Sequence, residues 1–354
     1  MSISLCPYGK DLNRKFLALP RHIYSEDVLT QSISDEKALL EGKHVLSRYF
    51  DFYPILALSG KAPAARGAVT VYHGDETAYF GFFESIRSRK AAAAVFDEAE
   101  RIAREKGCKR ICGPVDASFW IKYRLKVNHF ERPPYTGEPY NMPYYERLFL
   151  EAGYKAEHQY KSMHFKPMTE NIREEKFARR LEEKLSEGYI IKSPSAKSFG
   201  TSIREVYRML ISLYSDFPAY KFITEDEFVS IYSSLEFILD YSMVKLAYKD
   251  GQAVGFYISV PNICNLSAGR LTPGKLVKIL QIKKRPHEYV MLYMGVDEAH
   301  HGLGKALVQT IEQELVKNGA SSIGALIRTG KITGEYYSDY AEFDYLYRLY
   351  GKEL

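Results

Sequence analysis

The feature that most constrains this chain is an apolar strand followed by two closely spaced glycines and an amphipathic helix. We predict the strand over Tyr289 to Val296 and the helix over Leu303 to Lys317, where leucine and isoleucine recur at i, i+4 spacing. The first amides of a helix have no internal partners and lie at the positive end of its dipole. Gly302 and Gly304 let a bulky anion approach those amides. The segment therefore predicts a phosphate-binding turn.

Other phosphate-binding loops fit this segment poorly. A dinucleotide-binding turn would need a third glycine and an acidic residue at the end of the next strand. A Walker loop would need a lysine at a fixed distance followed by serine or threonine, whereas Lys305 is followed by Ala306. Both of these alternatives are set aside.

The same order of elements is predicted twice along the chain. The first copy has a β-hairpin, a helix that ends before Gly107, and a strand. Its segments are Gly67 to Tyr72, Thr77 to Phe83, Lys90 to Lys106 and Arg110 to Gly113. The second copy places the hairpin Val244 to Tyr248 and Ala253 to Val260 before the glycine turn, and the strand Ser322 to Ile327 after the helix. A duplicated α/β domain explains both copies.

The length of the chain also favours two domains, because 354 residues exceed a single ordinary core. Between the two copies lies a charge-rich stretch with a thin apolar seam of Phe177, Leu181 and Leu185. This pattern predicts an exposed helix that bridges two domains. We expect an N-terminal domain over residues 1–168, a linker helix over 169–188 and a C-terminal domain over 189–354.

Composition excludes several classes of protein. No apolar run approaches the roughly 20 residues of a membrane helix, and Lys10, Asp11 and Arg14 lie where a signal peptide would be apolar. We therefore expect a cytoplasmic protein that does not contact a membrane. The net charge of +5 is too small for a dedicated nucleic-acid binder, so a nucleic-acid partner is not expected. The four cysteines lack metal-site spacing, and we expect reduced thiols and no metal.

The glycine turn resembles the cofactor loop of the GNAT superfamily of acyl-CoA N-acyltransferases. That loop reads Arg/Gln-x-x-Gly-x-Gly/Ala between a strand and a helix, and the matching stretch here is Ala299-His300-His301-Gly302-Leu303-Gly304. Both glycines match, whereas Ala299 replaces the leading Arg or Gln. The resemblance implies an α/β (α+β) fold of two tandem GNAT-like domains, each a mixed, mainly antiparallel sheet flanked by helices.

The resemblance also implies where acetyl-CoA, the acyl donor, and coenzyme A, its product, would bind. The pantetheine arm would pair with backbone groups of Met294 and Val296. Gly295 suits the bulge that such strands carry, which splays the sheet and admits the cofactor. The pyrophosphate would lie on the backbone of His301, Gly302, Leu303, Gly304, Lys305 and Ala306.

The N-terminal half resembles an uncharacterised bacterial group of GNAT-like proteins over most of residues 14–165. Stretches that carry this resemblance include Phe80-Gly81-Phe82-Phe83-Glu84, Gly113-Pro114-Val115 and Asn141-Met142-Pro143-Tyr144-Tyr145. Where this half would have its phosphate turn, the chain reads Ser85-Ile86-Arg87-Ser88-Arg89-Lys90, without glycine. We therefore expect no ordinary coenzyme A site there, although the basic residues leave a phosphate contact open.

Acyl transfer to an amine needs a donor for the oxyanion and a proton for the departing thiolate. In GNAT enzymes a backbone amide of the splayed strand meets the oxyanion, here in the Val296 region. A tyrosine on the helix after the next strand then protonates the thiolate. That helix is expected over Thr333 to Glu342, and of its tyrosines 336, 337 and 340 we choose Tyr337 as the catalytic residue. The general base stays unassigned.

Two further segments bear on the acceptor site. The loop Asn128 to Tyr145 is rich in proline and aromatic residues, so we expect it to be extended and to lie near the second domain. The basic insertion Cys264 to Glu288 could roof the acceptor cleft, contact the adenosine 3′-phosphate, or form a solvated surface helix.

The sequence thus predicts an acyl-CoA-dependent N-acyltransferase whose activity lies in the C-terminal domain. Acetyl is the expected acyl group, and the partner is a small-molecule or peptide amine. Two alternatives stay open. One is a non-catalytic acyl-CoA sensor that uses the same turn. The other is a protein similar to the aminoacyl-tRNA-dependent peptidyltransferases, which also contain tandem GNAT-like domains.

Overall fold

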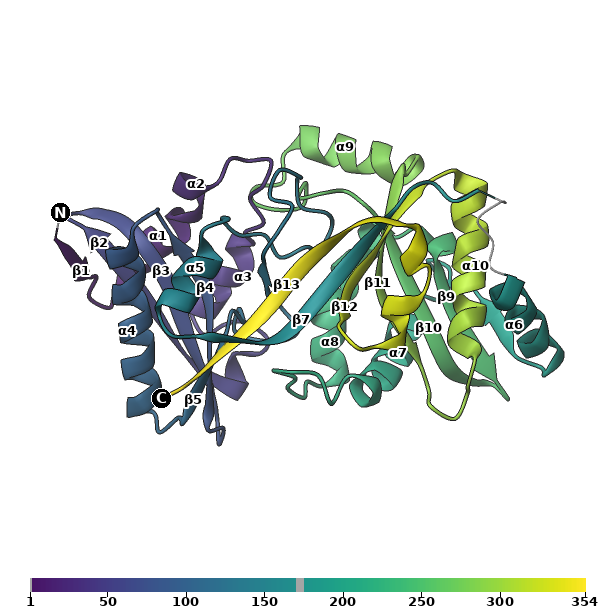
Figure 1. Cartoon of the computed structure of the whole chain (residues 1–354), viewed down its shortest axis with the longest axis horizontal. Helices are drawn as coiled ribbons and strands as arrows, with labels where there is room; N and C mark the ends of the chain where they lie inside the picture. The colour runs from purple at the N-terminus through teal and green to yellow at the C-terminus, as the bar shows by residue number, and fades with distance from the viewer. Residues whose placement is uncertain (1, 170–174) are drawn as a thin grey trace.

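The computed structural model describes residues 2–169 and 175–354, so part of the predicted linker, residues 170–174, lies outside the described residues. The described residues form one continuous mixed sheet with helices on both faces (Figure 1). Only two of the strand pairs are parallel, β4 with β5 and β11 with β12. The predicted fold class, a mainly antiparallel sheet flanked by helices, is confirmed. No helix in the described ranges is long and apolar enough to cross a membrane.

The N-terminal half contains a hairpin-rich sheet with α4 packed on one face. Its elements are β1 (Ile3–Leu5), α1 (Lys10–Ala18), α2 (Pro20–Ile23), α3 (Ile33–Leu40), η1 (Ser47–Tyr49), β2 (Phe50–Ser59), β3 (Ala62–Tyr72), β4 (Thr77–Ser85), α4 (Arg89–Glu105), β5 (Arg110–Gly113), β6 (Leu125–Lys126), α5 (Tyr145–Glu151) and β7 (Lys155–Phe165). The helix α4 buries its predicted face, with Val95 and Ala99 fully covered. Cys108 and Cys112 are buried free thiols, as expected.

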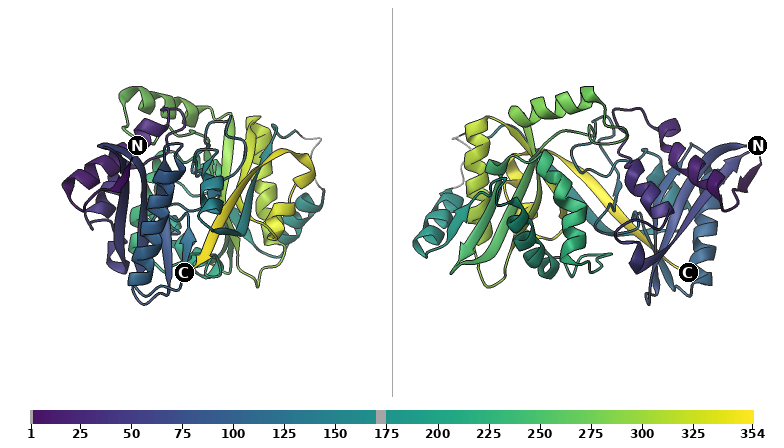
Figure 2. Two further views of the ribbon diagram at one scale, coloured as in Figure 1. Left: turned by 60° about the vertical axis from the view of Figure 1, so that its left-hand side comes forward. Right: turned by 180° about the vertical axis from the view of Figure 1, so that it is seen from behind.

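The C-terminal half repeats this plan, with α7 and α8 on one face of its strands and α10 on the other (Figure 2). Its elements are α6 (Glu175–Ser186), β8 (Ile190–Lys192), α7 (Phe199–Leu213), α8 (Glu225–Tyr232), η3 (Ser233–Phe237), η4 (Tyr241–Met243), β9 (Val244–Lys249), β10 (Gln252–Pro261), α9 (Pro273–Lys284), β11 (Glu288–Val296), α10 (Leu303–Asn318), β12 (Ser321–Arg328), η5 (Ile332–Glu335), η6 (Ser338–Tyr340) and β13 (Ala341–Glu353).

The two halves exchange their last strands. β13, which ends the C-terminal half, pairs with β5 of the N-terminal half, and β7 of the N-terminal half pairs with β12. β7 and β13 also pair with each other along most of their length, and both cross the middle of the molecule in Figure 1. The boundary predicted at residue 168 follows β7, so neither side of it contains a complete sheet of its own.

Candidate functional site

A gap opens in the sheet between β11 and β12. The two strands are paired in parallel from Glu288 to Met291, and β11 then continues to Val296 without this partner. Each strand carries an irregularity at the point of divergence. The pairing of β11 with β10 shifts register at Leu292, and β12 shifts against β7 near Leu326, which has a positive φ of 56°. Because bulges bend strands, these two irregularities account for the gap.

The bulge lies at Leu292 and not at Gly295, where the sequence suggested it. Gly295 stays in register opposite Phe256. A Cβ at Gly295 would lie 2.7 Å from side-chain atoms of both Leu213 and Phe256, so glycine is required there for packing. The sheet is splayed as expected, but its bulge lies three residues before Gly295.

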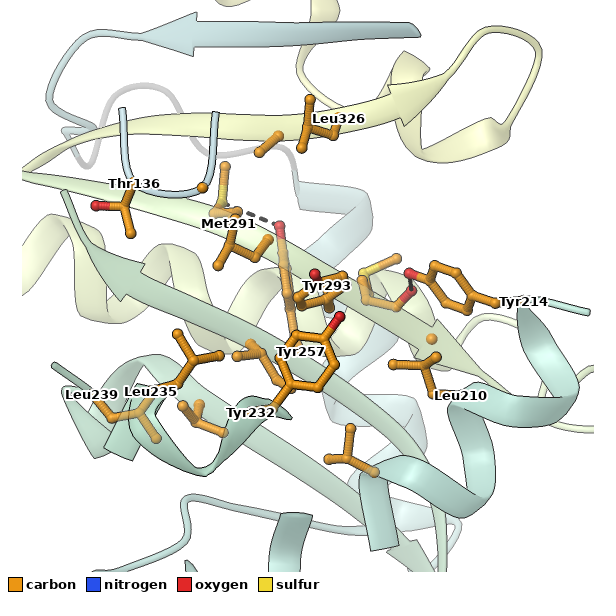
Figure 3. A pocket seen from close by; sticks show the side chains of 18 of the residues that line it. Thr136, Leu210, Tyr214, Tyr232, Leu235, Leu239, Tyr257, Met291, Tyr293 and Leu326 are labelled. Carbon is orange, nitrogen blue, oxygen red and sulfur yellow. Dashed lines mark hydrogen bonds between the residues drawn. The ribbon is translucent and has the colours of Figure 1, made fainter. Parts of the chain in front are cut away.

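The free edge of β11 presents backbone groups to the gap. The Asp297 amide donates to the Val254 carbonyl of β10 at 3.0 Å. Backbone groups of successive residues in a strand point to opposite neighbours, so those of Met294 and Val296 point away from β10 and toward the gap. The Met294 carbonyl accepts a hydrogen bond from the Tyr214 hydroxyl at 3.3 Å (Figure 3). The two residues predicted to pair with pantetheine therefore lie on the open edge.

The glycine turn follows β11 directly and begins α10. Gly302 is the N-cap of the helix with a φ of 81°, a conformation that favours glycine. Of the predicted cradle, the Leu303 amide donates to the His300 carbonyl, and the Lys305 and Ala306 amides donate to Gly302. The amides of His301, Gly302 and Gly304 have no acceptor among the described residues, so these three are the ones an anion could engage.

Gly304 and Gly302 differ in what surrounds them. A Cβ at Gly304 would meet only ordinary contacts, the nearest being Met294 Cε at 3.5 Å and the Tyr336 hydroxyl at 3.6 Å. A Cβ at Gly302 would lie 2.8 Å from the Cδ and Nε of Arg180. Arg180 belongs to α6, the predicted linker helix, which packs on α10 and also buries Phe177. No local pattern in the sequence predicts that this arginine reaches the turn.

The polar residues between β11 and α10 hold the turn itself. The Asp297 carboxylate accepts from the Ala299 amide at 3.0 Å. The His300 Nδ1 lies 2.7 Å from the Tyr189 hydroxyl. These contacts favour the interpretation that Asp297 and His300 shape the turn, and the general base stays unassigned.

A cleft of about 1870 Å³ runs along the gap and is lined by both halves of the chain. Pockets for single small ligands usually measure roughly 300–1,000 Å³, so this cleft has room for a donor and an acceptor together. Several tyrosines line the part shown in Figure 3, with Tyr214 directly after α7, Tyr232 at the end of α8 and Tyr293 on β11. Burial raises the pKa of each of these three hydroxyls, which keeps them protonated.

The helix predicted over Thr333 to Glu342 is wrong, because that segment contains only the short 3-10 turns η5 and η6. Tyr337 lies between them at a φ of 58°, which interrupts any helix. The Tyr337 side chain is buried, and its hydroxyl donates to Glu312 of α10 at 2.6 Å. Tyr336 instead directs its hydroxyl toward Gly304 and is half-buried, and burial raises its pKa. The structure thus places a second tyrosine at the gap beside the one predicted.

The corresponding gap of the N-terminal half is filled by its own chain. β4 and β5 pair from Thr77 to Tyr79 and then diverge, as β11 and β12 do. The segment after β5 returns to the free edge of β4, where the Val115 amide donates to Phe80 at 2.8 Å and the Asp116 carboxylate accepts from Phe82 at 2.5 Å.

Side chains close the remainder of this N-terminal gap. The Tyr145 hydroxyl accepts from the Ser85 amide at 2.8 Å and also donates to Glu84. Burial raises the pKa of Glu84 to about 7, and Tyr24 donates a further hydrogen bond to it. The backbone edge that a pantetheine arm would need is therefore occupied in this half, and its phosphate turn also lacks glycine.

The two segments expected near the acceptor site lie in different places. The loop 128–145 does reach the second half, where the Thr136 amide donates to Asn262 at 3.0 Å and Thr136 lines the cleft. The basic insertion forms α9, which ends just before the start of β11. The glycine turn follows the other end of that nine-residue strand, roughly 26 Å away. This separation removes the contact with a 3′-phosphate. Leu271 and Ile279 of the insertion line the cleft, so a roof over the acceptor cleft stays a prediction beside that of an exposed helix.

Comparison of folds agrees with this geometry. A tandem GNAT protein from the clavulanic acid biosynthesis pathway superposes with a TM-score of 0.54 at 10% identity, covering 99% of this chain and 98% of that one. This chain has a tandem GNAT fold. A conserved Enterococcus faecalis V583 protein described as a probable N-acyltransferase superposes with a TM-score of 0.51 at 11% identity, over 100% of this chain and 73% of that one. The predicted GNAT resemblance is confirmed for the fold.

The similarity of this chain to known proteins is weaker in sequence than in structure. No protein-family model matches the chain. The protein YghO of Escherichia coli K12 is 22% identical over 218 residues, which are 59% of this chain and 54% of that protein. The match thus spans about half the length of that curated relative.

Proposed function

We propose that this protein is an acyl-CoA-dependent N-acyltransferase whose active site lies in the C-terminal half. The observation that carries the proposal is the open gap between β11 and β12, which leads directly to the glycine turn of α10. An extended thioester with a phosphate group at one end matches this arrangement of a free strand edge and a helix N-terminus. Acetyl is the simplest acyl group, and the acceptor is an amine.

The residues present fit the donor. The outward backbone groups of Met294 and Val296 would pair with an amide-containing arm, and the turn at Gly302 would take the pyrophosphate. A Cβ at Gly304 would lie between Met294 and Tyr336. Glycine therefore leaves space for the pantetheine arm of the donor at the point where it would reach the turn. Arg180 brings a positive charge to the turn, which offsets the absence of a cationic side chain at Ala299.

The acyl donor supplies a thioester, and the chain supplies positions for the protons. In the reaction the amine nitrogen forms a bond to the carbonyl carbon, the carbon–sulfur bond breaks, and the amine proton is lost while the thiolate gains one. A β11 amide facing the gap would donate to the developing oxyanion. Tyr336 would deliver the proton to sulfur, because its hydroxyl faces the gap, whereas the predicted Tyr337 already donates to Glu312.

Binding of acetyl-CoA to a Gly304→Glu variant tests the site. Gly304 has no positive φ and a Cβ there would meet only ordinary van der Waals contacts, so the variant should fold, while its carboxylate would fill the gap and repel the pyrophosphate. Gly200→Glu is a matched control, because Gly200 lies in the first turn of α7 and nothing lies within 4 Å of its Cβ position. Gly302 is a poorer choice, since its positive φ would strain any replacement.

Calorimetry should show one acetyl-CoA per chain for the intact protein and for Gly200→Glu, and no binding for Gly304→Glu. Unchanged binding by Gly304→Glu would refute the site. Two molecules per chain would show that the N-terminal gap can open. Binding without release of thiol in the presence of any amine would favour the non-catalytic sensor.

A further inference from the structure

Arg124 on the wall of the cleft has no ion pair with a carboxylate of the described residues. Arg124 comes from the N-terminal half, just before β6, and adopts a φ of 91°, a strained conformation for arginine. Its guanidinium carbon lies 3.7 Å from the centre of the Tyr123 ring and 4.4 Å from that of Tyr160. The group donates to the Tyr123 hydroxyl, whereas its Nε is buried without a hydrogen-bond partner among the described residues. The side chain is thus fixed and incompletely satisfied.

Neighbouring cations in the same segment are all paired. Lys122 lies 2.9 Å from the Asp116 carboxylate, and Lys126 lies 2.7 Å from that of Glu138. Arg124, between them, has no carboxylate within 4.0 Å in the described part of the chain. A largely buried cation without a counterion is costly, and strain at the same residue adds to the cost. Such a residue is explained if an anion from outside the chain completes it.

A second arginine stands beside it on the C-terminal half. Arg328, at the end of β12, is paired in register with Tyr160 of β7. Residues directly opposite in a sheet project from the same face, so Arg328 shares a face of the sheet with Tyr160, whose ring Arg124 contacts. The positive charges of both arginines oppose the burial-induced rise in the pKa of Tyr160. Both arginines line the cleft, and Arg328 also has no ion pair with a described carboxylate. Each half of the molecule thus contributes one cation to this part of the cleft.

This corner of the cleft adjoins the gap where acyl transfer would occur. The positive charge of Arg124 opposes the burial-induced rise in the pKa of Tyr214 and Tyr293. Tyr214 in turn hydrogen-bonds the Met294 carbonyl on the free edge of β11. The segment that carries Arg124 is anchored to the C-terminal half, because the Tyr232 hydroxyl donates to the Trp120 carbonyl at 2.9 Å. Arg124 is therefore placed by both halves.

We propose that Arg124, with Arg328 beside it, binds a carboxylate of the acceptor, so that the amine substrate is an amino acid or a similar carboxylate-bearing amine. The proposal rests on the acyltransferase function proposed above. The planar guanidinium fork matches a carboxylate in two hydrogen bonds, and in a largely apolar cleft such a contact is stronger than in water. It also gives the N-terminal half, whose own gap is closed, a role in selecting the acceptor.

Leucine and tyrosine side chains around the cleft indicate the remainder of the acceptor. Leu210, Leu235 and Tyr232 face the same space as Tyr293 (Figure 3). An apolar or aromatic amino-acid side chain would cover this surface while its carboxylate meets Arg124. Phenylalanine and leucine are therefore suitable probes.

The test compares acceptors that differ only in the carboxylate. Thiol release from acetyl-CoA is measured with phenylalanine against phenethylamine, and with leucine against isopentylamine, for the intact protein, Arg124→Met and Arg124→Lys. We expect kcat/KM to be at least about tenfold higher for the amino acids in the intact protein. Arg124→Met should lower kcat/KM for the amino acids at least about tenfold more than for the two amines, and Arg124→Lys should restore the preference only in part.

Controls separate this inference from the function on which it rests. Arg132→Met removes an arginine of the N-terminal half whose side chain is 46% exposed, and it should keep the preference for amino acids. Arg124→Gly is a second variant that relieves the positive φ, so it should fold even if Arg124→Met does not. Acetyl-CoA binding by calorimetry should be unchanged in all of them, because Arg124 lies away from the glycine turn.

Each outcome decides the matter. Equal turnover of amines and amino acids by the intact protein, or an equal loss for both in Arg124→Met, overturns the carboxylate site and leaves the acyltransferase function standing. If no acceptor is turned over, calorimetry with N-acetylphenylalanine decides. Binding that is lost in Arg124→Gly supports the site, and absence of binding to the intact protein overturns it. Failure of acetyl-CoA to bind would count against the proposed function alone.

Discussion

At the scale of single residues, two adjacent tyrosines differ in what their hydroxyls contact. Tyr336 faces Gly304 across the gap, and Tyr337 donates to the buried Glu312. We expect Tyr336→Phe to lower kcat on the order of a hundredfold, because the thiolate loses its proton donor, while KM for acetyl-CoA changes little. Tyr337→Phe should leave kcat within a few-fold and lower the free energy of unfolding by about 1–3 kcal/mol, since Glu312 loses a buried donor.

Steady-state kinetics and urea denaturation of both variants check this assignment. A large fall in kcat for Tyr337→Phe, with Tyr336→Phe active, would restore the residue chosen from the sequence. The sequence could not separate the two tyrosines, because the choice depends on the positive φ of Tyr337. Nothing in the amino-acid pattern marks a non-glycine residue for that conformation.

At the scale of elements, α6 brings the cation of Arg180 against the glycine turn. Arg180 lies against Gly302 and pairs with Glu183 at 2.7 Å, both side chains being 40% exposed. We expect Arg180→Ala to raise the Kd of acetyl-CoA about tenfold, through loss of a charge-assisted contact to phosphate, and to weaken the salt dependence of binding. Calorimetry at two salt concentrations measures both effects.

Arg179→Ala is the matched control for the Arg180 variant. Arg179 has the same helix, charge and acidic neighbour, but its side chain is 76% exposed. The Arg179→Ala variant should bind acetyl-CoA with the Kd of the intact protein. If the two variants lost affinity equally, the effect of Arg180 would come from the general charge of α6 and not from contact with the turn.

Elements defined by local pattern were predictable, and those that depend on distant pairing were not. The predicted helix over Leu303 to Lys317 and the strand Arg110 to Gly113 match α10 and β5 within one residue. Both follow from apolar periodicity bounded by glycine. The bulge at Leu292 depends on the register with β10, and register is set by the partner strand as much as by the sequence of β11. Gly295 is needed for close packing against Leu213 and Phe256, and it does not mark the position of the bulge.

At the scale of the whole molecule, the order of elements that occurs twice in the sequence is built into one continuous sheet. The pairing of β7 with β13 joins residues far apart in the chain, and no local pattern announces it. The cleft has the same origin, because its walls combine Thr136 and Arg124 of one half with Tyr214 and Tyr293 of the other. Residues of the N-terminal half and the open C-terminal gap therefore line one cleft.

Strand exchange makes a prediction about how the chain can be divided. Residues 1–168 expressed alone should not form a stable monomer, because β5 would lose β13, and β7 would lose both β12 and β13. Unpaired strand edges of this kind aggregate or remain unfolded. Residues 169–354 should fail for the same reason, since β12 loses β7. Co-expression of the two fragments should restore a one-to-one complex that binds acetyl-CoA, because the missing strands are then supplied in trans.

Size-exclusion chromatography and circular dichroism distinguish these states, and a cooperatively unfolding monomer of residues 1–168 would contradict the prediction. In that case β7 and β13 would be a secondary contact between two independent domains, and the contribution of Arg124 to the acceptor site would depend on docking and not on the fold itself.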